Sequence, residues 1–312
     1  MSATARLDAT VLALKSAAEP TRLRLLALLC HGELQVGEVC RVLGQSQPRI
    51  SRHLRLLTEA GFLDRFREQQ CVYYRTPAHS SRMGWLRQLL EEMGRSEPVL
   101  RRDHERMTQV IAARARAAVR GERAGGPERT SAGSGAVEQF AALLLEEVGP
   151  VGMGELLDIG TGGGELLEVL ARRARHAVGI DISTRALRVA RARVHGAGLS
   201  HCEFHHGDMY ELPVDDASFD TVTMDRVLAE ASRPAAAIGE AARALRPGGR
   251  LIIVEQLERL ESQVAARPLQ LLRSWLAAAG LQAERLRPCP LTGGDFLIAT
   301  ARRTAAAAEE RA

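Results

Sequence analysis

The sequence predicts two domains of different fold class: a mostly helical N-terminal domain that ends in a β hairpin, and a C-terminal α/β domain with a doubly wound, mostly parallel sheet. Three observations support this prediction. At 312 residues the chain is long for a single core. Helical periodicity and two β-type runs fill residues 20–76, whereas strand-like and helix-like runs alternate from residue 155 on. A Gly- and Ser-rich stretch separates the two patterns.

The same features set the expected domain boundaries. Residues 1–80 form the N-terminal domain, and residues 81–120 form a helical connector whose apolar stripe is typical of a dimerising helix. Residues 121–135 form a flexible linker, residues 136–303 form the α/β domain, and residues 304–312 form a disordered tail.

The N-terminal elements follow one another in a recognisable order. A helix over residues 7–18 is followed by one that Pro20 starts and Gly32 ends. A short helix over residues 35–43, the turn Gly44-Gln45-Ser46 and a second helix to Ala60 come next. Residues 62–67 and 71–76 read as the two strands of a hairpin. Helix, turn, helix and hairpin is the order of a winged helix-turn-helix.

The second of these helices has one apolar and one basic face. Ile50, Leu54 and Leu57 share the face that points to the core, and Arg52 and Arg55 lie opposite. Arginine donates a fork of hydrogen bonds to guanine or phosphate, and glutamine can read adenine. The predicted contacts to double-stranded DNA are therefore Ser46, Gln47, Arg49, Ser51, Arg52 and Arg55 from the turn and helix, with Arg65 and Arg67 from the wing.

Charge is distributed unevenly along the chain. Residues 1–125 hold 21 Lys and Arg against 13 Asp and Glu, and the remainder holds 21 against 25. A basic half joined to an acidic half fits a first domain that meets a polyanion, although a solvated charged surface would give the same count. Five widely spaced cysteines, no long apolar run and no signal-like N-terminus lead us to expect a cytoplasmic protein without a membrane span.

Several motifs of the N-terminal domain occur in the order of a known family. AEPTRLRLLALL, GELQVGEVC, LGQSQPRISRHLRLLTEAGFL and CVYYR closely resemble the arsenic-repressor-like family of winged-helix regulators. The resemblance implies a homodimer on an inverted-repeat operator, with base contacts from Gln47, Arg49, Ser51 and Arg52.

This sequence departs from that family at its metal site. Many metal-sensing members carry Cys-x-Cys within Glu-Leu-Cys-Val-Cys, whose thiolates bind soft metals. Here the segment is Glu33-Leu34-Gln35-Val36-Gly37, so both ligands are missing. Asp103 and His104 form no ligand array, and we interpret them as surface polar residues. We expect no bound metal.

The C-terminal domain carries four separate signals at predicted strand ends. The strands are ELLDIG, AVGID, CEFHHGD, FDTVTM, RLIIVE, AERLRP and DFLIATA, with helices between most of them. A glycine-rich loop follows Asp158, and Asp181 ends the second strand, where a carboxylate can accept two ribose hydroxyls. Asp208 lies where it can meet an adenine amino group, and Pro247 to Arg250 form the turn into the fifth strand.

Together these four features resemble the class I S-adenosylmethionine-dependent methyltransferases, whose Rossmann-like sheet adds an antiparallel strand that DFLIATA matches. The resemblance implies S-adenosylmethionine or its product S-adenosylhomocysteine as ligand. The candidate residues for that ligand are Asp158, Gly160, Thr161, Gly162, Gly164, Asp181, Ile182, Asp208, Met209 and Asp225.

Catalytic equipment is less evident than ligand-binding equipment. The Asn/Asp-Pro-Pro-Tyr/Phe signature of base methylation is absent, and only a short segment separates Glu255 from Leu269, where many methyltransferases build a lid. We interpret His201, His205 and His206 as polar residues of an edge strand without a carboxylate that orients them. Since methyl transfer needs mainly orientation of its reactants, the absence of a catalytic residue does not exclude an enzyme.

Two functions therefore stay open, and a metal-responsive repressor is disfavoured by Gln35 and Gly37. In the first, the methyltransferase-like domain senses its ligand and reports it to the DNA-binding dimer. In the second, the chain methylates a small molecule and controls its own gene. The two-domain arrangement resembles the S-adenosylhomocysteine-responsive regulators of the methionine cycle, which implies repression relieved by that ligand.

Overall fold

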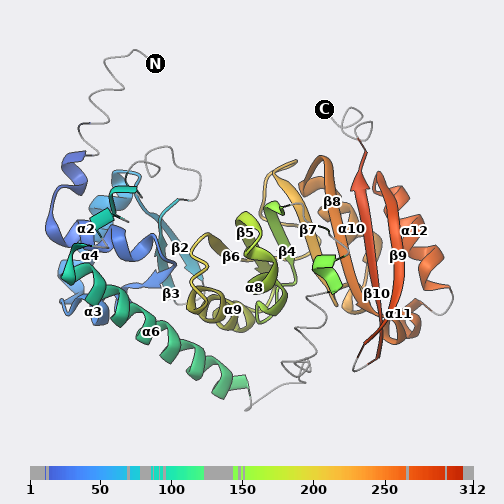
Figure 1. Ribbon diagram of the computed structural model, residues 1–312, viewed down its shortest axis with the longest axis horizontal. Coiled ribbons are helices and arrows are strands. Elements are labelled where there is room, and N and C mark those ends of the chain that lie inside the picture. Colours follow the sequence, from blue (N-terminus) through green and yellow to red (C-terminus); the bar gives the residue numbers. More distant parts are fainter. Residues whose placement is uncertain are drawn as a thin grey trace. The chain divides into compact units, whose positions relative to one another are not determined.

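The computed structural model describes residues 11, 14–68, 71–77, 86, 88–90, 92–93, 96–122, 143–146, 149, 152–264, 267–291 and 294–304. The chain divides into two compact units, Met1–Ala117 with His195–His201, and Ala118–Val194 with Cys202–Ala312. The elements are labelled in Figure 1. Within the described residues, no helix is both long enough and apolar enough to span a membrane.

The first unit has the predicted winged helix-turn-helix order. Its elements are α2 (Pro20–Leu29), β1 (Leu34–Gln35), α3 (Val36–Leu43), α4 (Gln47–Glu59), β2 (Asp64–Glu68), β3 (Cys71–Arg75) and α6 (Pro98–Glu122). Pro20 starts α2, and the Oε2 atom of Glu19 caps it by accepting from the amide of Arg22 at 2.9 Å. Gly44 turns the chain between α3 and α4 with a φ of 65°, a conformation that favours glycine.

A short strand that the sequence pattern did not predict completes the small sheet. Strand β1 pairs antiparallel with β3, which gives the order β1-β3-β2. The side chain of Gln35 donates from Nε2 to the Tyr73 hydroxyl at 2.8 Å. Two residues are too few to show the alternation of a strand, so only the pairing with β3 reveals β1.

Helix α6 packs on the core of the first unit. Met107 and Ile111 are buried in the same cluster as Leu25 and Leu54. Asp103 is 2% exposed, and its carboxylate accepts from Nε and Nη2 of Arg24 at 2.6 and 2.8 Å. The interpretation of Asp103 as a surface polar residue is therefore wrong, because a long-range arginine partner, invisible in the local sequence, pays for its burial.

Helix α6 also extends past the predicted start of the linker, since it ends at Glu122. The rest of the predicted linker and the tail after Thr304 lie outside the described residues. Of the predicted helix over residues 136–148, residues 143–146 are described and are helical. The predicted domain boundaries remain predictions.

The second unit is an α/β domain with a seven-stranded sheet. Its elements are β4 (Gly154–Ile159), α8 (Glu165–Ala171), β5 (Ala174–Asp181), α9 (Thr184–Gly196), β6 (Cys202–His206), β7 (Phe219–Asp225), η1 (Leu228–Glu230), α10 (Pro234–Ala244), β8 (Leu245–Gln256), α11 (Leu257–Val264), α12 (Pro268–Ala278), β9 (Leu281–Leu291) and β10 (Gly294–Arg303). The strand order is β6-β5-β4-β7-β8-β10-β9.

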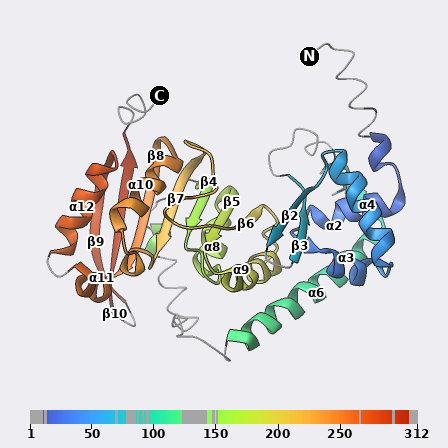
Figure 2. The ribbon, with the colours of Figure 1, turned by 180° about the vertical axis from the view of Figure 1, so that it is seen from behind.

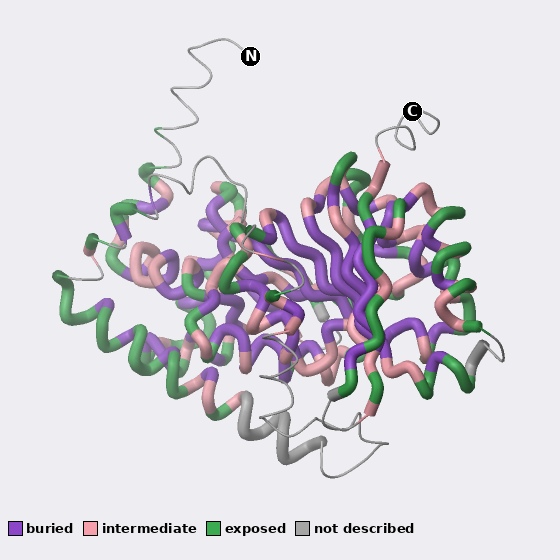
Figure 3. The backbone as a smooth tube through the Cα atoms, turned by 45° about the vertical axis from the view of Figure 1, so that its right-hand side comes forward, coloured by how far each residue is buried: buried purple, intermediate pink, exposed green. Residues whose placement is uncertain are grey.

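This topology is the one that the class I resemblance implies. Strands β6, β5, β4, β7 and β8 are parallel, and β10 runs antiparallel between β8 and β9. Helices α10 and α12 pack together on one face, as Figure 2 shows. The central strands are buried along most of their length (Figure 3), so they read as continuous apolar runs.

Two details differ from the prediction for this domain. Strand β8 begins at Leu245, so Pro247 to Arg250 lie inside it and do not precede it, with Gly248 at a φ of 78°. Helix α11 occupies Leu257–Val264, where the sequence indicated only a short segment. It is short enough that eight residues gave no clear helical period against the surrounding polar residues.

Candidate functional site

The carboxyl ends of the five parallel strands bring the predicted acidic residues to one edge of the sheet. Asp158 lies next to the end of β4, Asp181 ends β5, Asp208 follows β6 by two residues, and Asp225 ends β7. Because the strand order is β6-β5-β4-β7, these four side chains follow one another along the edge. In open α/β sheets this edge is where ligands bind.

The loop after β4 depends on its glycines. Gly160, Gly162 and Gly164 have φ values of 70°, 54° and 76°, which other residues rarely adopt. A Cβ on Gly160 would lie 2.5 Å from Cγ2 of Val227, and one on Gly164 would lie 3.0 Å from the backbone of Ala190. The loop is thus held against both α9 and the segment after β7, and its backbone is open to close approach by a ligand.

Asp181 joins this loop to the end of β5. It is 6% exposed, and its Oδ2 accepts from the amide of Gly162 at 2.8 Å while Oδ1 accepts from the amide of Ser183 at 2.7 Å. The two amides fix the orientation of the carboxylate, and a carboxylate offers about four acceptor positions. The arrangement suits a pair of vicinal hydroxyls at the mouth of the loop.

The part of the edge that would face an adenine is more open. Asp208 is exposed, and its Oδ1 accepts from the amide of Tyr210 at 3.0 Å. Ile182 is 67% exposed, an unusual state for a large apolar side chain, and Met209 is half-buried. An apolar side chain next to the ribose-binding position can pack on a flat aromatic ring.

Asp158 is buried below the glycine loop. Its Oδ1 accepts from the Thr223 hydroxyl at 2.6 Å. Burial raises the pKa of Asp158 to about 7, against the opposing effect of the Thr223 hydrogen bond. Thr161, another predicted ligand residue, is also buried, at 7% exposure. Both side chains support the loop from within, so their predicted role in ligand binding remains a prediction.

The raised pKa of Asp158 has a definite effect on stability. Its ordinary value is 3.8 and its value in the folded protein is about 7. Between these two values the folded state holds a proton that the unfolded state has lost, so the free energy of unfolding falls as pH rises from about 4 to about 7. Asp158→Asn cannot ionise, and we expect it to lose this part of the pH dependence.

Urea unfolding at pH 5 and pH 8 measures the effect. The stability difference between the two pH values should be smaller in Asp158→Asn than in the wild type. Glu255, whose pKa burial also raises to about 7, keeps a fall of the same sign in both proteins. Asp215→Asn, at an exposed aspartate, is the control. A variant that retains the full wild-type difference would contradict the prediction.

Three residues at this edge were not singled out from the sequence. Thr223 donates to Asp158, Arg226 forms an ion pair with Asp225 at 2.9 Å, and Glu255 is fully buried at the end of β8. Glu255 accepts from the amides of Ala229 and Gln256, both at 3.0 Å. A polar residue at the end of an apolar strand was the available signal, and it marks Glu255 and Thr223 only weakly.

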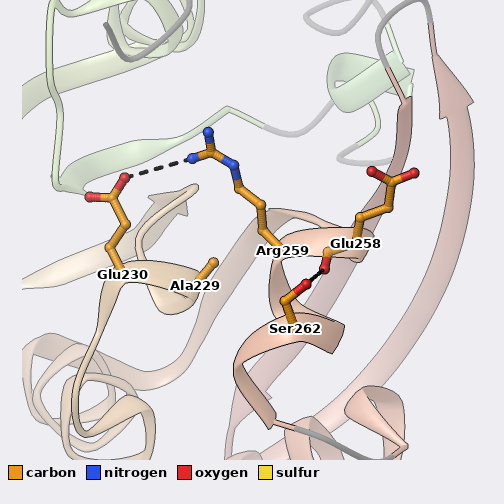
Figure 4. Close-up of a pocket in the computed structure, with 5 residues that line it drawn as sticks. All are labelled: Ala229, Glu230, Glu258, Arg259 and Ser262. Atoms are coloured by element: carbon orange, nitrogen blue, oxygen red, sulfur yellow. Dashed lines mark hydrogen bonds and ion pairs between the residues drawn. The ribbon is translucent and has the colours of Figure 1, made fainter. Parts of the chain in front are cut away.

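A cavity of about 420 Å³ opens beside this edge. It is lined by Ala229, Glu230, Glu258, Arg259 and Ser262, which come from η1 and α11 (Figure 4). Nη1 of Arg259 reaches toward Oε1 of Glu230 at 3.9 Å, and the Ser262 hydroxyl donates to the carbonyl of Glu258 at 2.8 Å. Since η1 follows β7 and α11 follows β8, the cavity lies at the ligand-binding end of the sheet.

The histidines near β6 are arranged differently from the expectation. Strand β6 is at the edge of the sheet, as expected. However, Nε2 of His205 lies 3.5 Å from Glu203, and Glu203 also lies 3.4 Å from Nε2 of the buried His176. The interpretation that no carboxylate orients these histidines is wrong for His205, because the alternation of β6 places Glu203 and His205 on the same face.

The structure presents the predicted DNA-reading side chains on one side of α4. Ile50, Leu54 and Leu57 are fully buried. The exposed residues are Ser46, Gln47, Arg49, Arg52 and Arg55, with Arg65 and Arg67 on β2, whereas Ser51 is half-buried. Among the residues that the structure describes, no group of three or more His, Cys, Asp or Glu side chains could hold a metal ion.

Comparisons with known proteins match both units. A family model described as "Bacterial regulatory protein, arsR family" matches residues 19–65, and one described as "Methyltransferase domain" matches residues 157–253. The chain is 40% identical over 108 residues to a demethylmenaquinone methyltransferase of Clavibacter sepedonicus. That match covers 35% of this chain and 43% of the relative, so the chain spans less than half of that enzyme's length.

A solved S-adenosylmethionine-dependent methyltransferase from Mesorhizobium loti aligns with 54% of this chain and 100% of its own, at 18% identity and a TM-score of 0.45. The chain is also 42% identical over 84 residues to the arsenical resistance operon repressor of Escherichia coli K12, a match that covers 27% of this chain and 70% of that repressor. With its winged helix-turn-helix followed by a class I S-adenosylmethionine-dependent methyltransferase domain, the chain belongs to the arsR family of bacterial regulatory proteins.

Proposed function

We propose that this protein is a transcriptional repressor whose methyltransferase-like domain senses S-adenosylhomocysteine, or S-adenosylmethionine, and that ligand binding releases it from DNA. The proposal depends above all on the Asp181 carboxylate, which is buried between the amides of Gly162 and Ser183. This is a preorganised acceptor for a ribose, attached to a chain that also carries an arsR-family DNA-binding domain.

The predicted operator contacts support the DNA-binding half of the proposal. Arg49, Arg52 and Arg55 lie exposed on the side of α4 opposite its buried stripe. Exposed arginines on a recognition helix can contact base edges and phosphates at the same time. We propose Ser46, Gln47, Ser51 and Arg67 as further contacts.

A homodimer on an inverted repeat fits the apolar surface of the first unit. Val11, Leu14, Leu89 and Val99 are large apolar side chains that are 36% to 43% exposed in the single chain. A second copy that covers them would remove apolar surface from water. Two reading heads about one helical turn apart would then meet the two half-sites.

The target genes follow from the resemblance to regulators of the methionine cycle. S-adenosylhomocysteine is the product of methyl transfer, so a repressor released by it would switch on genes that remove it. We therefore propose the genes of S-adenosylhomocysteine hydrolysis and methionine synthesis as targets.

A second candidate function is methyl transfer to a small molecule. The cavity lined by Glu230, Glu258, Arg259 and Ser262 favours it, because this space at the ligand-binding end of the sheet is large enough for a small polar acceptor. In that case the chain would be an enzyme that controls its own gene.

Calorimetric titration of the full chain with each adenosyl ligand tests the proposal. We expect one S-adenosylhomocysteine or S-adenosylmethionine to bind per chain, with no acceptor added. A parallel screen for transfer of a radiolabelled methyl group separates the two candidates, since the sensor needs none. Absence of binding for both ligands would contradict both candidate functions.

A further inference from the structure

A charged pair, Asp225 and Arg226, lies at the end of β7 beside the glycine loop. Ile159 of β4 pairs in parallel register with Met224, so the next residues, Gly160 and Asp225, come level at the edge of the sheet. On the other side, the amide of Arg226 donates to the carbonyl of Val254 on β8 at 2.8 Å. The pair is thus fixed between β4 and β8.

The backbone at Arg226 has an uncommon conformation. Its φ is 53°, in the left-handed region that residues other than glycine rarely adopt. The turn directs Val227 against Gly160, where Cγ2 occupies the space that a Cβ would need. Residues in such conformations persist where the surrounding structure over-determines them.

The guanidinium of Arg226 faces the carboxylate of Asp225 through only part of its donors. Nη2 donates to Oδ2 at 2.9 Å, and Nε lies 3.2 and 3.3 Å from the two oxygens. Nη1 is not engaged by Asp225. The side chains are 29% and 16% exposed, so the pair is partly shielded from water but remains accessible.

Neighbouring carboxylates are already bound to other groups. Glu255 accepts from the amides of Ala229 and Gln256, and Glu165 accepts an ion pair from Arg193 at 2.8 Å. Asp225 and Arg226 together therefore offer one negative and one positive group, side by side, at the surface of this edge.

The spacing along the sheet relates this pair to the ribose position. Strand β5, which ends at Asp181, and strand β7, which ends at Asp225, are separated by β4 alone. Adjacent strands lie about 4.8 Å apart, so the two ends are about 10 Å apart. An adenosyl ligand with its ribose at Asp181 and its sulfur over the glycine loop would bring its amino-acid end to β7.

We infer that Asp225 and Arg226 form the subsite for the amino-acid end of the ligand, with the α-carboxylate accepting from Nη1 of Arg226 and the α-ammonium donating to Asp225. The inference rests on the proposed function, since it assigns a further part of the same ligand site. A zwitterion fits this pair because each of its charges meets the opposite charge.

The test compares two ligands that differ only at this end. S-adenosylhomocysteine carries the amino acid, whereas 5′-methylthioadenosine keeps the adenosine and the thioether without it. Titration calorimetry uses the full chain and its Arg226→Asn variant, because asparagine accepts the left-handed conformation. Arg226→Lys keeps the charge without the fork, and Arg302→Gln removes an arginine paired with Glu284 at 2.8 Å, at the opposite end of β8.

Arg226→Asn should weaken S-adenosylhomocysteine binding at least about tenfold, the effect of one charge-assisted pair. Its affinity for 5′-methylthioadenosine should stay within about twofold of the wild type, Arg226→Lys should be intermediate, and Arg302→Gln should match the wild type for both ligands. Equal losses for both ligands, or no loss for either, would overturn the inference and leave the proposed function standing. If the wild type binds neither ligand, the proposed function fails as well.

Discussion

Asp181→Ala should abolish binding of S-adenosylhomocysteine and S-adenosylmethionine, while DNA binding without ligand persists. The carboxylate lies at the mouth of the glycine loop and is held by the amides of Gly162 and Ser183. Two charge-assisted bonds to the ribose hydroxyls contribute about 3 kcal/mol or more, so their loss weakens binding by more than about a hundredfold. The loop also loses the acceptor of its Gly162 amide, which adds to the effect.

Calorimetry with both ligands measures this loss, and gel shifts with operator DNA show whether the first unit still works. Asp215→Ala removes an exposed carboxylate from the same domain and serves as the control. Asp181→Asn retains an acceptor oxygen without the charge and should show an intermediate loss. An Asp181→Ala variant that titrates like the wild type would mean that the ligand binds elsewhere.

Arg52→Ala should weaken operator binding by about 1–3 kcal/mol, the discrimination that one good bidentate contact supplies. Arg52 is exposed on α4, on the side opposite the buried Ile50, Leu54 and Leu57. Because its side chain takes no part in that core, the variant should stay folded and dimeric. Binding to scrambled DNA should fall less than binding to the operator.

Gel shifts against operator and scrambled DNA test this prediction. Arg101→Ala removes the same charge from an exposed position on α6 and separates a specific contact from a change in net charge. Equal affinity of Arg52→Ala and wild type for both DNAs would show that another helix, or another face of α4, reads the operator.

Local pattern predicted most of the elements that position these residues. Prolines and glycines at helix ends predicted α2 and α4, and continuous apolar runs that end in Asp158, Asp181 and Asp225 predicted the ligand edge of the sheet. Those signals lie within a few residues of the features they mark, so the sequence alone carries them.

Long-range partners decided what the sequence could not predict. The burial of Asp103 depends on Arg24, 79 residues away, and the strand β1 exists through its pairing with β3. Likewise, the left-handed turn at Arg226 follows from packing of Val227 against Gly160, which no local pattern indicates. A polar residue next to an apolar run looks the same whether its partner lies in solvent or across the fold.

The central claim is that a ligand in the second domain changes the affinity of the first for DNA. Such coupling requires the ligand to bind the free and the DNA-bound states unequally, by the same factor that DNA changes ligand affinity. A small rotation of one reading head is enough, since the two heads of a dimer must match half-sites about one helical turn apart.

Fluorescence anisotropy of labelled operator, titrated with the full chain under each ligand, tests this claim most directly. We expect S-adenosylhomocysteine to lower operator affinity at least several-fold and S-adenosylmethionine to act more weakly, with no methyl acceptor present. Asp181→Ala should bind the operator without responding to either ligand. Operator affinity that is indifferent to both ligands, together with robust methyl transfer in the parallel assay, would contradict the sensor and favour the enzyme.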